Sequence, residues 1–379
     1  MERDSCRDIY RKLDLLINKT IKNSVFTACS IGFSMMNQRG VFRDIYSWGK
    51  TDFGSYGKKA VKTTFFDMAS LTKPIVTALC IVALIEEEKI SLDDTLSCCL
   101  GVACPFDKIK IKIVHLLSHS SGLPAHKPYY IKLINYPLAK RNEKIIEWIL
   151  KEKLCCEPGE KAVYSDLGYI LLGYVIEKIS GQNLDSYWKR KIIEPLKLEK
   201  SLFFLNETNL TQNEYVVTGN CAWSKVKLCG VVHDDNCRSL GGVAGHAGLF
   251  GSAEGLLSLC EHLIEQFKGR KKHPSYSSSS LMRFSEKREG SSWALGFDTP
   301  TPGLSSSGNY FSQKSIGHLG FTGTSFWIDL QRDIAVIMLT NRVSCGENVE
   351  KIRELRPVVH DIIMERLILP RQHKSERGR

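Results

Sequence analysis

The chain has 379 residues, of which 43% are hydrophobic and 25% are charged, a profile typical of a soluble globular protein with a substantial core. Its formal net charge is +11, but the positive residues are spread along the chain and cluster only at 270–272 and in the C-terminal tail. No nucleic-acid-binding motif accompanies them, so we predict no nucleic-acid partner.

The N-terminal segment is predicted to form a helix at 5–22, followed by a meander of strands at 25–36, 41–49 and 61–66. The first helix is charged and amphipathic, which differs from the basic start, apolar run and cleavage site of a secretory signal. We therefore expect a cytoplasmic protein.

Ser70-Leu71-Thr72-Lys73 is the most informative motif. Its spacing places the Ser70 hydroxyl and the Lys73 amine one helical turn apart, with the helix beginning just before Ser70 and Asp67 at the N-cap position. A serine nucleophile needs a neighbouring base or cation and donors for an oxyanion, which Lys73 and the helix N-terminus supply. Because Ser-x-x-Lys recurs by chance in chains of this length, it indicates a catalytic serine only together with the other motifs of the chain.

The middle of the chain is predicted to be mainly helical, with helices at 74–89, 110–119, 142–153, 167–180 and 253–267. The apolar stretch at 74–85 is too short to cross a bilayer, so we predict no integral membrane segment. Thirteen cysteines include the adjacent pairs at 98–99 and 155–156, and none forms Cys-x-x-Cys. This pattern favours reduced thiols over a disulfide framework or a zinc site.

Tyr164-Ser165-Asp166 precedes the helix at 167–180 and is a second candidate element. A phenol close to Ser70 and Lys73 could pass a proton between nucleophile and leaving group, provided that Lys73 lowers the phenol pKa. In the alternative interpretation Tyr164 is a core aromatic residue and Asp166 caps the helix that follows.

The C-terminal part is predicted to contain strands at 293–298, 314–320, 324–330 and 334–340 and a closing helix at 350–367. A tight turn at 331–333 makes 324–340 a hairpin. Both ends of the chain therefore build sheet, and the middle is inserted as a helical lobe.

Residues 317–324, Gly-His-Leu-Gly-Phe-Thr-Gly-Thr, form a third candidate element. Their glycines let the backbone approach a ligand, so the Phe321 N–H could hold an oxyanion while His318 assists binding or proton transfer. Alternatively, the glycines mark a bulge and His318 is structural.

In this order the three elements resemble those of the serine β-lactamase and penicillin-binding-protein superfamily, specifically its class C-like branch of D-alanyl-D-alanine carboxypeptidases, esterases and related serine hydrolases. That family carries Ser-x-x-Lys, Tyr-x-Asn and a Lys- or His-centred triad ending in Gly. Segments 116–123, 158–169, 232–236 and 241–248 also look familial, so the resemblance covers about residues 20–368.

The resemblance implies an α/β (α+β) fold of the β-lactamase/DD-peptidase type, with an antiparallel sheet from the N- and C-terminal segments, flanking helices and an inserted helical lobe. We predict one catalytic domain at 1–368, divided into a sheet lobe at about 1–73 and 286–368 and a helical lobe at about 74–285. A basic tail follows at 369–379.

The resemblance also implies roles for single residues. Ser70 would be the acylated nucleophile, Lys73 the amine that activates it, and Tyr164 a partner in proton relay. Backbone N–H groups of Ser70 and Phe321 would form the oxyanion hole, and His318 would replace the cation of the third motif.

Two substrate-side positions depart from the family pattern. Asp166 stands where many members have Asn, and His318-Leu319-Gly320 stands where β-lactamases usually have Lys-Thr-Gly. A carboxylate at 166 should pair with Lys73 and raise its pKa, and a histidine should hold a substrate carboxylate less firmly than a lysine does. Both departures argue against an efficient penicillin-destroying enzyme.

His233-Asp234 resembles a pair used by metal-dependent phosphohydrolases, but no further ligands follow at a recognisable spacing, so we predict neither a metal nor a cofactor. We expect His119, His233 and His246 to be loop residues that bond to backbone and shape the site.

The sequence thus predicts a serine hydrolase that forms an acyl-enzyme on Ser70 with a small amide or ester, such as a peptidoglycan-derived peptide ending in D-alanine. A penicillin-binding sensor without turnover and a β-lactamase proper are the alternatives. The sequence leaves the substrate and the oligomeric state open.

Overall fold

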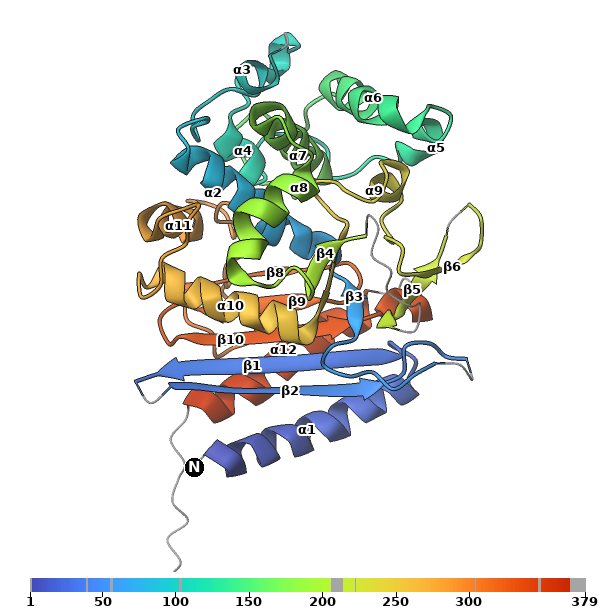
Figure 1. The fold of residues 1–379 in the computed structure, drawn as a ribbon, viewed down its shortest axis with the longest axis vertical. Coiled ribbons are helices and arrows are strands. Elements are labelled where there is room, and N and C mark those ends of the chain that lie inside the picture. The colour runs from blue at the N-terminus through green and yellow to red at the C-terminus, as the bar shows by residue number, and fades with distance from the viewer. Residues whose placement is uncertain are drawn as a thin grey trace, which may run out of the picture.

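The computed structural model describes residues 2–38, 40–54, 57–101, 104–205, 214–221, 223–303, 305–346 and 349–368, so the predicted basic tail lies outside the described residues. A helical lobe stands above an antiparallel sheet, and the helices from the two ends of the chain lie beneath that sheet (Figure 1).

The main sheet joins the two ends of the chain, as predicted. Its five strands run in the order β2-β1-β10-β9-β8. Residues opposite each other include Ile31 and Met338 on the central pair β1 and β10. The strands are β1 (Ala28–Asn37), β2 (Gly40–Gly49), β8 (Ser315–Leu319), β9 (Ser325–Asp329) and β10 (Ile334–Thr340). The predicted hairpin at 324–340 is confirmed, because β9 pairs directly with β10.

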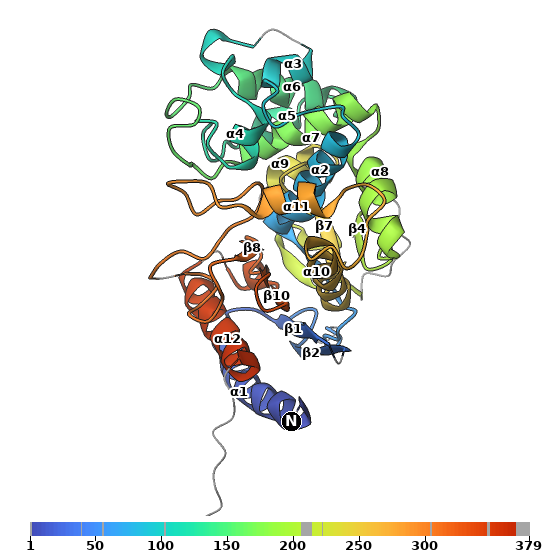
Figure 2. The ribbon, with the colours of Figure 1, turned by 90° about the vertical axis from the view of Figure 1, so that its left-hand side faces the viewer.

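Period-two alternation of apolar residues gives this sheet two buried faces. Ile328 and Ile337 point into the core shared with α10 (Ala253–Phe267) and the helical lobe, whereas Trp327 and Val336 point into a second core beneath the sheet. That second core is closed by α1 (Glu2–Lys22) and α12 (Glu350–Ile368), which lie side by side (Figure 2).

The helical lobe surrounds the buried segment that carries Ser70 and Lys73. That segment comprises the short turn η1 (Ala69–Leu71), the wider-wound η2 (Lys73–Ala78) and α2 (Leu79–Glu86). Around it lie α3 (Leu96–Leu100), η3 (Phe106–Lys108), α4 (Ile113–Leu117), α5 (Tyr130–Leu133), α6 (Leu138–Lys151), α7 (Asp166–Ser180), α8 (Leu184–Trp188), η4 (Lys189–Ile193), η5 (Glu194–Leu196), α9 (Asp235–Ser239) and α11 (Ser278–Ser285).

The run Ala69–Glu86 is long and apolar enough to cross a membrane by length and composition, and 78% of it is buried inside the protein. A core helix passes that test as readily as a membrane span does.

Two smaller sheets connect the lobes. β3 (Phe65–Asp67) pairs with β7 (Leu249–Ser252), which also pairs with β4 (Leu202–Phe204), and β5 (Val217–Asn220) pairs with β6 (Lys227–Cys229). The third strand of the predicted meander, at 61–66, is therefore wrong. Only the last two residues of that segment are in a strand, β3, and β3 does not belong to the main sheet. Short strands whose partners lie far away in sequence leave little periodic signal.

Two further predictions need correction. The segment at 293–298 forms no strand and makes only single bridges, from Trp293 to Asp298 and from Asp298 to Gly317. The helical segment after β3 does not begin at an Asp67 cap, because Asp67 ends β3 and Met68 stands at the cap position of η1. Asp67 still accepts a hydrogen bond, at 2.8 Å, from the N–H of Ala69.

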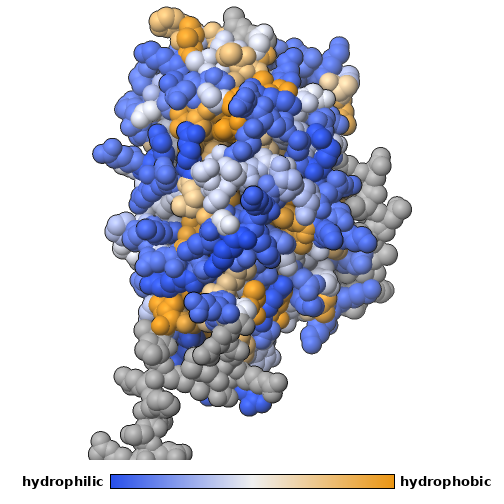
Figure 3. Space-filling model, turned by 60° about the vertical axis from the view of Figure 1, so that its left-hand side comes forward, coloured by the Kyte–Doolittle hydropathy of each residue, from blue (hydrophilic) through white to orange (hydrophobic). Residues whose placement is uncertain are grey.

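On the face drawn in Figure 3, hydrophilic side chains predominate and apolar residues occur in small groups. None of the thirteen cysteines is joined to another in a disulfide.

Candidate active site

Ser70 is presented by a strained turn. Ala69, immediately before it, has a positive φ of 47°, a backbone conformation that non-glycine residues adopt at a cost. Two hydrogen bonds from the third candidate element, residues 317–324, hold this turn. Thr322 Oγ1 donates to the carbonyl of Asp67 at 2.8 Å, and Thr324 Oγ1 donates to the carbonyl of Met68 at 3.2 Å. Contacts between residues 255 and 256 positions apart in the sequence thus hold the candidate nucleophile in place.

Lys73 lies directly behind Ser70 and is completely buried. Its Nζ donates to Ser70 Oγ at 2.9 Å, to Asp166 Oδ1 at 2.7 Å and to the carbonyl of His246 at 3.2 Å. The same Nζ lies 4.9 Å from the centre of the Tyr164 ring. The spacing in Ser-x-x-Lys therefore produces the contact that the sequence predicts.

The Lys73–Asp166 pair fixes the charge at the centre of the site. Burial alone would lower the pKa of Lys73, but the charge and hydrogen bond of Asp166, together with the interaction with Tyr164, outweigh it and raise that pKa. Burial would likewise raise the pKa of Asp166, but Lys73, with smaller contributions from His126 and His246, holds that pKa well below its ordinary range. At neutral pH the site thus contains an ammonium and a carboxylate, as the departure at position 166 predicts.

Tyr164 lines the cavity but carries its proton more firmly than an ordinary tyrosine. Burial raises its pKa and outweighs the lowering by the Lys73 charge. The predicted proton relay required Lys73 to lower the pKa of Tyr164, but the net shift of that pKa is upward. Tyr164 is therefore a proton donor at neutral pH. The alternative interpretation, in which Asp166 caps the helix that follows, is also wrong. Ser165 caps α7 by accepting a hydrogen bond from the Gly168 N–H, and Asp166 is the first residue of the helix.

His318 lies on edge strand β8 and is neutral, because burial and then the Lys73 charge lower its pKa to about 3. Its Nδ1 donates to the carbonyl of Leu319 at 2.8 Å, which leaves the lone pair on Nε2. That Nε2 atom is buried and has no hydrogen-bond partner among the described residues. His318 therefore supplies an acceptor and not a cation.

Glycine at position 320 lets β8 approach the nucleophile turn. A Cβ there would lie 2.0 Å from Thr324 Oγ1 and 2.8 Å from the carbonyl oxygen of Met68, both impossibly close. The next residue, Phe321, is half-exposed, and its N–H donates to no group in the described chain. Its ring stacks on the His233 ring with the two ring centres 5.7 Å apart, and the Arg342 guanidinium lies 4.4 Å from the centre of the Phe321 ring.

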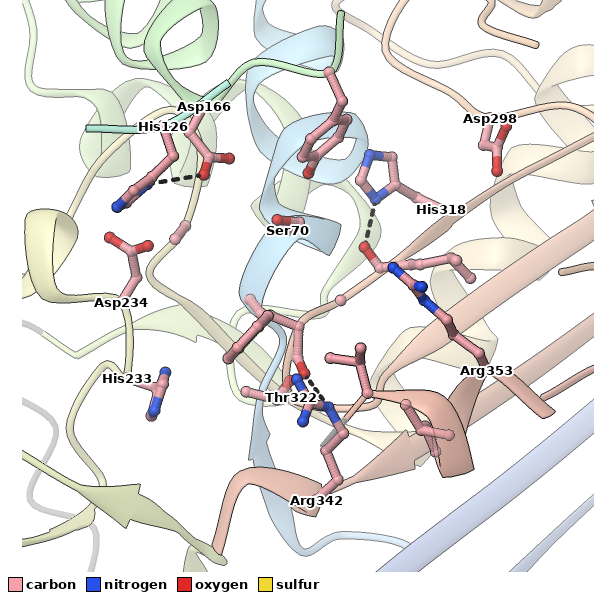
Figure 4. Close-up of a pocket in the computed structure, with 18 of the residues that line it drawn as sticks. Ser70, His126, Asp166, His233, Asp234, Asp298, His318, Thr322, Arg342 and Arg353 are labelled. Atoms are coloured by element: carbon pink, nitrogen blue, oxygen red, sulfur yellow. Dashed lines mark hydrogen bonds and ion pairs between the residues drawn. The ribbon is translucent and has the colours of Figure 1, made fainter. Parts of the chain in front are cut away.

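A cavity of about 700 Å³ opens at the junction of the two lobes, with Ser70 near its middle (Figure 4). Apart from Lys73, which lies behind Ser70, all of the predicted site residues line it: Ser70, Tyr164, Asp166, His318, Gly320 and Phe321. The structure therefore brings together residues from β3–η1, the start of α7, and β8.

Several polar residues of this site were missed by sequence reasoning. His126 Nδ1 lies 3.5 Å from Asp166 Oδ2, and the hydrogen bond to that carboxylate raises the pKa of His126. Trp293, Asp298 and three arginines, Arg342, Arg353 and Arg356, also line the cavity. Isolated residues in loops or on a helix carry no local motif, so only the fold could place them.

The expectation that His119, His233 and His246 bond to backbone is confirmed for the ring of His119 and wrong for the ring of His246, which pairs with a carboxylate. His119 Nδ1 accepts from the Ser165 N–H at 3.1 Å, the His233 N–H donates to Asp67 at 2.8 Å, and His246 Nε2 lies 2.9 Å from Asp234 Oδ1. In the described parts of the chain no three His, Cys, Asp or Glu side chains are grouped so as to hold a metal ion.

Comparison with known proteins agrees with this geometry. The family model described as Beta-lactamase matches residues 36–359. The chain belongs to the β-lactamase family. It is 30% identical over 367 residues to an N-acetylmuramyl-L-alanine amidase of Bacillus subtilis (strain 168), covering 88% of this chain and 80% of the relative.

Other members of the β-lactamase family extend the comparison. A putative D-alanyl-D-alanine carboxypeptidase of Escherichia coli (strain K12) is 31% identical over 309 residues, which cover 75% of this chain and 70% of that one. A solved beta-lactamase/D-alanine carboxypeptidase from Pseudomonas syringae superposes with a TM-score of 0.74 at 16% identity, covering 96% and 99% of the two chains. The predicted fold and superfamily are thus confirmed, and the relatives are named as hydrolases.

Proposed function

We propose that the protein is a serine hydrolase that forms an acyl-enzyme on Ser70 with a small amide or ester substrate. The observation that carries this proposal is the contact of Ser70 Oγ with Lys73 Nζ, at 2.9 Å, at the middle of a cavity that Tyr164 and Phe321 also line. An activated hydroxyl, a proton donor and an unused backbone N–H are what acyl transfer requires.

Asp166 is the terminal proton acceptor in this proposal. As Ser70 Oγ bonds to the substrate carbonyl carbon, its proton passes to Lys73 while Lys73 passes one of its own to Asp166, so the ammonium charge is unchanged. The 2.9 Å and 2.7 Å contacts of Lys73 Nζ provide the path. The oxyanion that forms is held by the N–H groups of Ser70 and Phe321.

Tyr164 completes the cycle. Its phenol donates a proton to the leaving nitrogen or oxygen as the scissile bond breaks, and Asp166 returns the stored proton through Lys73 to the phenolate. Water then attacks the acyl carbon, and the same groups act in reverse to release Ser70 and the acid product.

The relatives indicate the kind of bond. The amidase and the putative carboxypeptidase both have names that specify alanine-containing substrates. We propose a peptidoglycan-derived peptide with an alanine next to the scissile amide as the substrate of this chain.

Labelling tests the nucleophile. The protein is incubated with a fluorophosphonate or a fluorescent penicillin, and its intact mass is measured. We expect one adduct on the wild type and none on Ser70→Ala. An unlabelled wild type, or an adduct that survives Ser70→Ala, contradicts the proposal. Hydrolysis of a D-alanyl-D-alanine peptide beyond one equivalent then separates an enzyme from a sensor.

We also propose that the protein works in the cytoplasm, since none of its thirteen cysteines is in a disulfide. Fractionation of the native cells, with antibody detection, tests this location. Recovery in an envelope or secreted fraction contradicts it.

A further inference from the structure

His126 lies beside the carboxylate that receives the Ser70 proton in the proposed relay. Its Nδ1 is 3.5 Å from Asp166 Oδ2, while Lys73 Nζ is 2.7 Å from Oδ1 of the same carboxylate. In the view of Figure 4, Asp166 lies between Ser70 and the His126 ring. Asp166 therefore connects a buried amine with an imidazole.

The two side chains that contact this carboxylate in the described chain differ in their access to solvent. Lys73 has no exposed surface, whereas 48% of the His126 side chain is exposed. His126 also lines the cavity. An unperturbed imidazole gains and loses a proton close to neutral pH. His126 is thus placed where a proton can pass between the buried pair and water.

The loop that carries His126 is held on two sides by hydrogen bonds. At the start of α7, the Asp166 N–H donates to the carbonyl of Ala125 at 2.8 Å. On α9, Asn236 Nδ2 donates to the carbonyl of Lys127 at 2.8 Å. Both neighbours of His126 in the chain are therefore anchored, which keeps its ring close to Asp166.

Carboxylates face His126 from both of these helices: Asp166 from α7, and Asp234 and Asp235 from the start of α9. The hydrogen bond to Asp166, helped by the charges of all three carboxylates, raises the pKa of His126 against the effect of burial. His126 is therefore a stronger base than an ordinary histidine. The three carboxylates also have partners of their own, which are Lys73, His246 and Arg238 in the same order.

Deacylation at Ser70 sets a proton free. The oxygen of water bonds to the acyl carbon as water gives up a proton, the bond from that carbon to Ser70 Oγ breaks, and Oγ takes up a proton. The products are the serine hydroxyl and a carboxylic acid, which is ionised at neutral pH. One proton must therefore leave the site after each deacylation, and Lys73 cannot take it to solvent because it is buried and already charged.

We infer that His126 takes this proton from Asp166 and passes it to solvent, and so resets the Lys73–Asp166 pair for the next turnover. The neutral imidazole accepts the proton on a ring nitrogen, Asp166 becomes a carboxylate again, and the imidazolium gives a proton to water. His126 acts through Asp166 and touches no reacting atom, so it is a positioning residue. The inference rests on the proposed hydrolysis at Ser70.

A single turnover measures acylation and deacylation separately. Excess enzyme is mixed with p-nitrophenyl acetate in dilute buffer. Release of p-nitrophenolate gives the acylation rate, and the intact mass of quenched samples gives the rate at which the acetyl-enzyme is lost. We expect His126→Ala to be acylated within about twofold of the wild-type rate and to lose its acetyl group about tenfold more slowly.

Added imidazole should restore deacylation of His126→Ala, because it can accept a proton in place of the missing ring. Pyrazole, a ring of the same size that takes up no proton at neutral pH, should not. His262→Ala is the matched control, because His262 is a half-buried histidine on α10 that does not line the cavity. It should behave like the wild type with and without imidazole.

The pH profile gives a second readout that a purely structural role would not change. Only the neutral imidazole accepts a proton, so wild-type deacylation in dilute buffer should rise with pH through the pKa of His126, which is raised above its ordinary value. His126→Ala should lack this rise.

Three results overturn the inference: wild-type deacylation by His126→Ala in dilute buffer, a loss that imidazole does not relieve, or equal acceleration of the wild type by imidazole. In each of them an acetyl-enzyme that forms on Ser70 and is hydrolysed leaves the proposed function standing. A wild type that forms no acetyl-enzyme, or never loses it, contradicts the proposed function and the inference with it.

Discussion

Lys73 Nζ lies 2.7 Å from Asp166 Oδ1 with the ammonium fully buried, so the amine beside the candidate nucleophile is a paired cation and not a free base. The pair determines how the site should respond to pH and to substitution. Burial would favour a neutral amine, and the carboxylate reverses that preference.

Asp166→Asn should therefore change the pH dependence of acylation. In the wild type acylation needs ionised Asp166, whose pKa is held below its usual range, so the rate should be flat from acid to neutral pH. In the variant Lys73 itself must lose a proton, so at pH 6 acylation should be about tenfold or more slower and the deficit should close as pH rises. Stopped-flow acylation by a fluorescent penicillin gives both profiles, and parallel profiles would contradict the relay.

The same substitution should lower stability. The raised Lys73 pKa stabilises the fold below the pKa of an unfolded lysine, and the lowered Asp166 pKa stabilises it above that of an unfolded aspartate. Their pair thus acts across the whole range between roughly pH 4 and pH 10. Asp166→Asn breaks the pair and should lower the free energy of unfolding by about 3–5 kcal/mol at pH 7, measured by urea unfolding. The loss should be smaller at pH 10, because the unpaired, buried Lys73 of the variant can give up its proton there. A cost that does not fall with pH would point to lost packing.

Tyr164→Phe should discriminate between leaving groups. An amide nitrogen must be protonated as it leaves, whereas p-nitrophenolate needs no proton. We expect kcat for a peptide amide to fall by about 10²–10⁴-fold and that for p-nitrophenyl acetate to change much less. Similar losses on both substrates would show that Tyr164 acts by positioning Ser70 and not by donating a proton.

His318 should make the fold sensitive to acid. Its pKa of about 3 lies below that of an unfolded histidine, so the unfolded chain binds more protons below pH 6.5 and stability falls there by about 1.4 kcal/mol per pH unit. His318→Asn should flatten this slope between pH 6.5 and 4.5 in urea unfolding.

His360 provides the comparison. It is also buried, burial lowers its pKa to about 3, and it does not line the cavity. His360→Asn should flatten the slope equally but leave acylation of Ser70 unchanged. An unaltered slope in both variants would contradict the neutral state assigned to these histidines.

Gly320→Ala should disturb the contact between the lobes. The added methyl group meets Thr324 Oγ1 and the Met68 carbonyl, so we expect a loss of about 1–3 kcal/mol in the free energy of unfolding and slower acylation. Gly54→Ala is the control, because its nearest neighbour would lie at 3.6 Å. Equal stability of the two variants would contradict the close approach.

Much of the fold follows from local patterns. The helices that close the chain at both ends and the strands at 314–320, 324–330 and 334–340 have clear periodicity, and the structure has them there. The prediction for the third strand of the meander was wrong, since a three-residue strand depends on a partner distant in sequence, here β7. The predicted strand at 293–298 was wrong because that segment folds back on itself, with Trp293 bridged to Asp298.

The sequence by itself determined the pairing of Ser70 with Lys73, because three residues along a helical segment leave the two side chains adjacent. It also showed that a carboxylate stands at position 166. Only the tertiary structure decided the charge of the groups around Ser70: that Lys73 is a paired ammonium, Tyr164 a protonated phenol and His318 a neutral acceptor. Those protonation states depend on burial and on charged residues of other helices and strands, and the local sequence specifies neither.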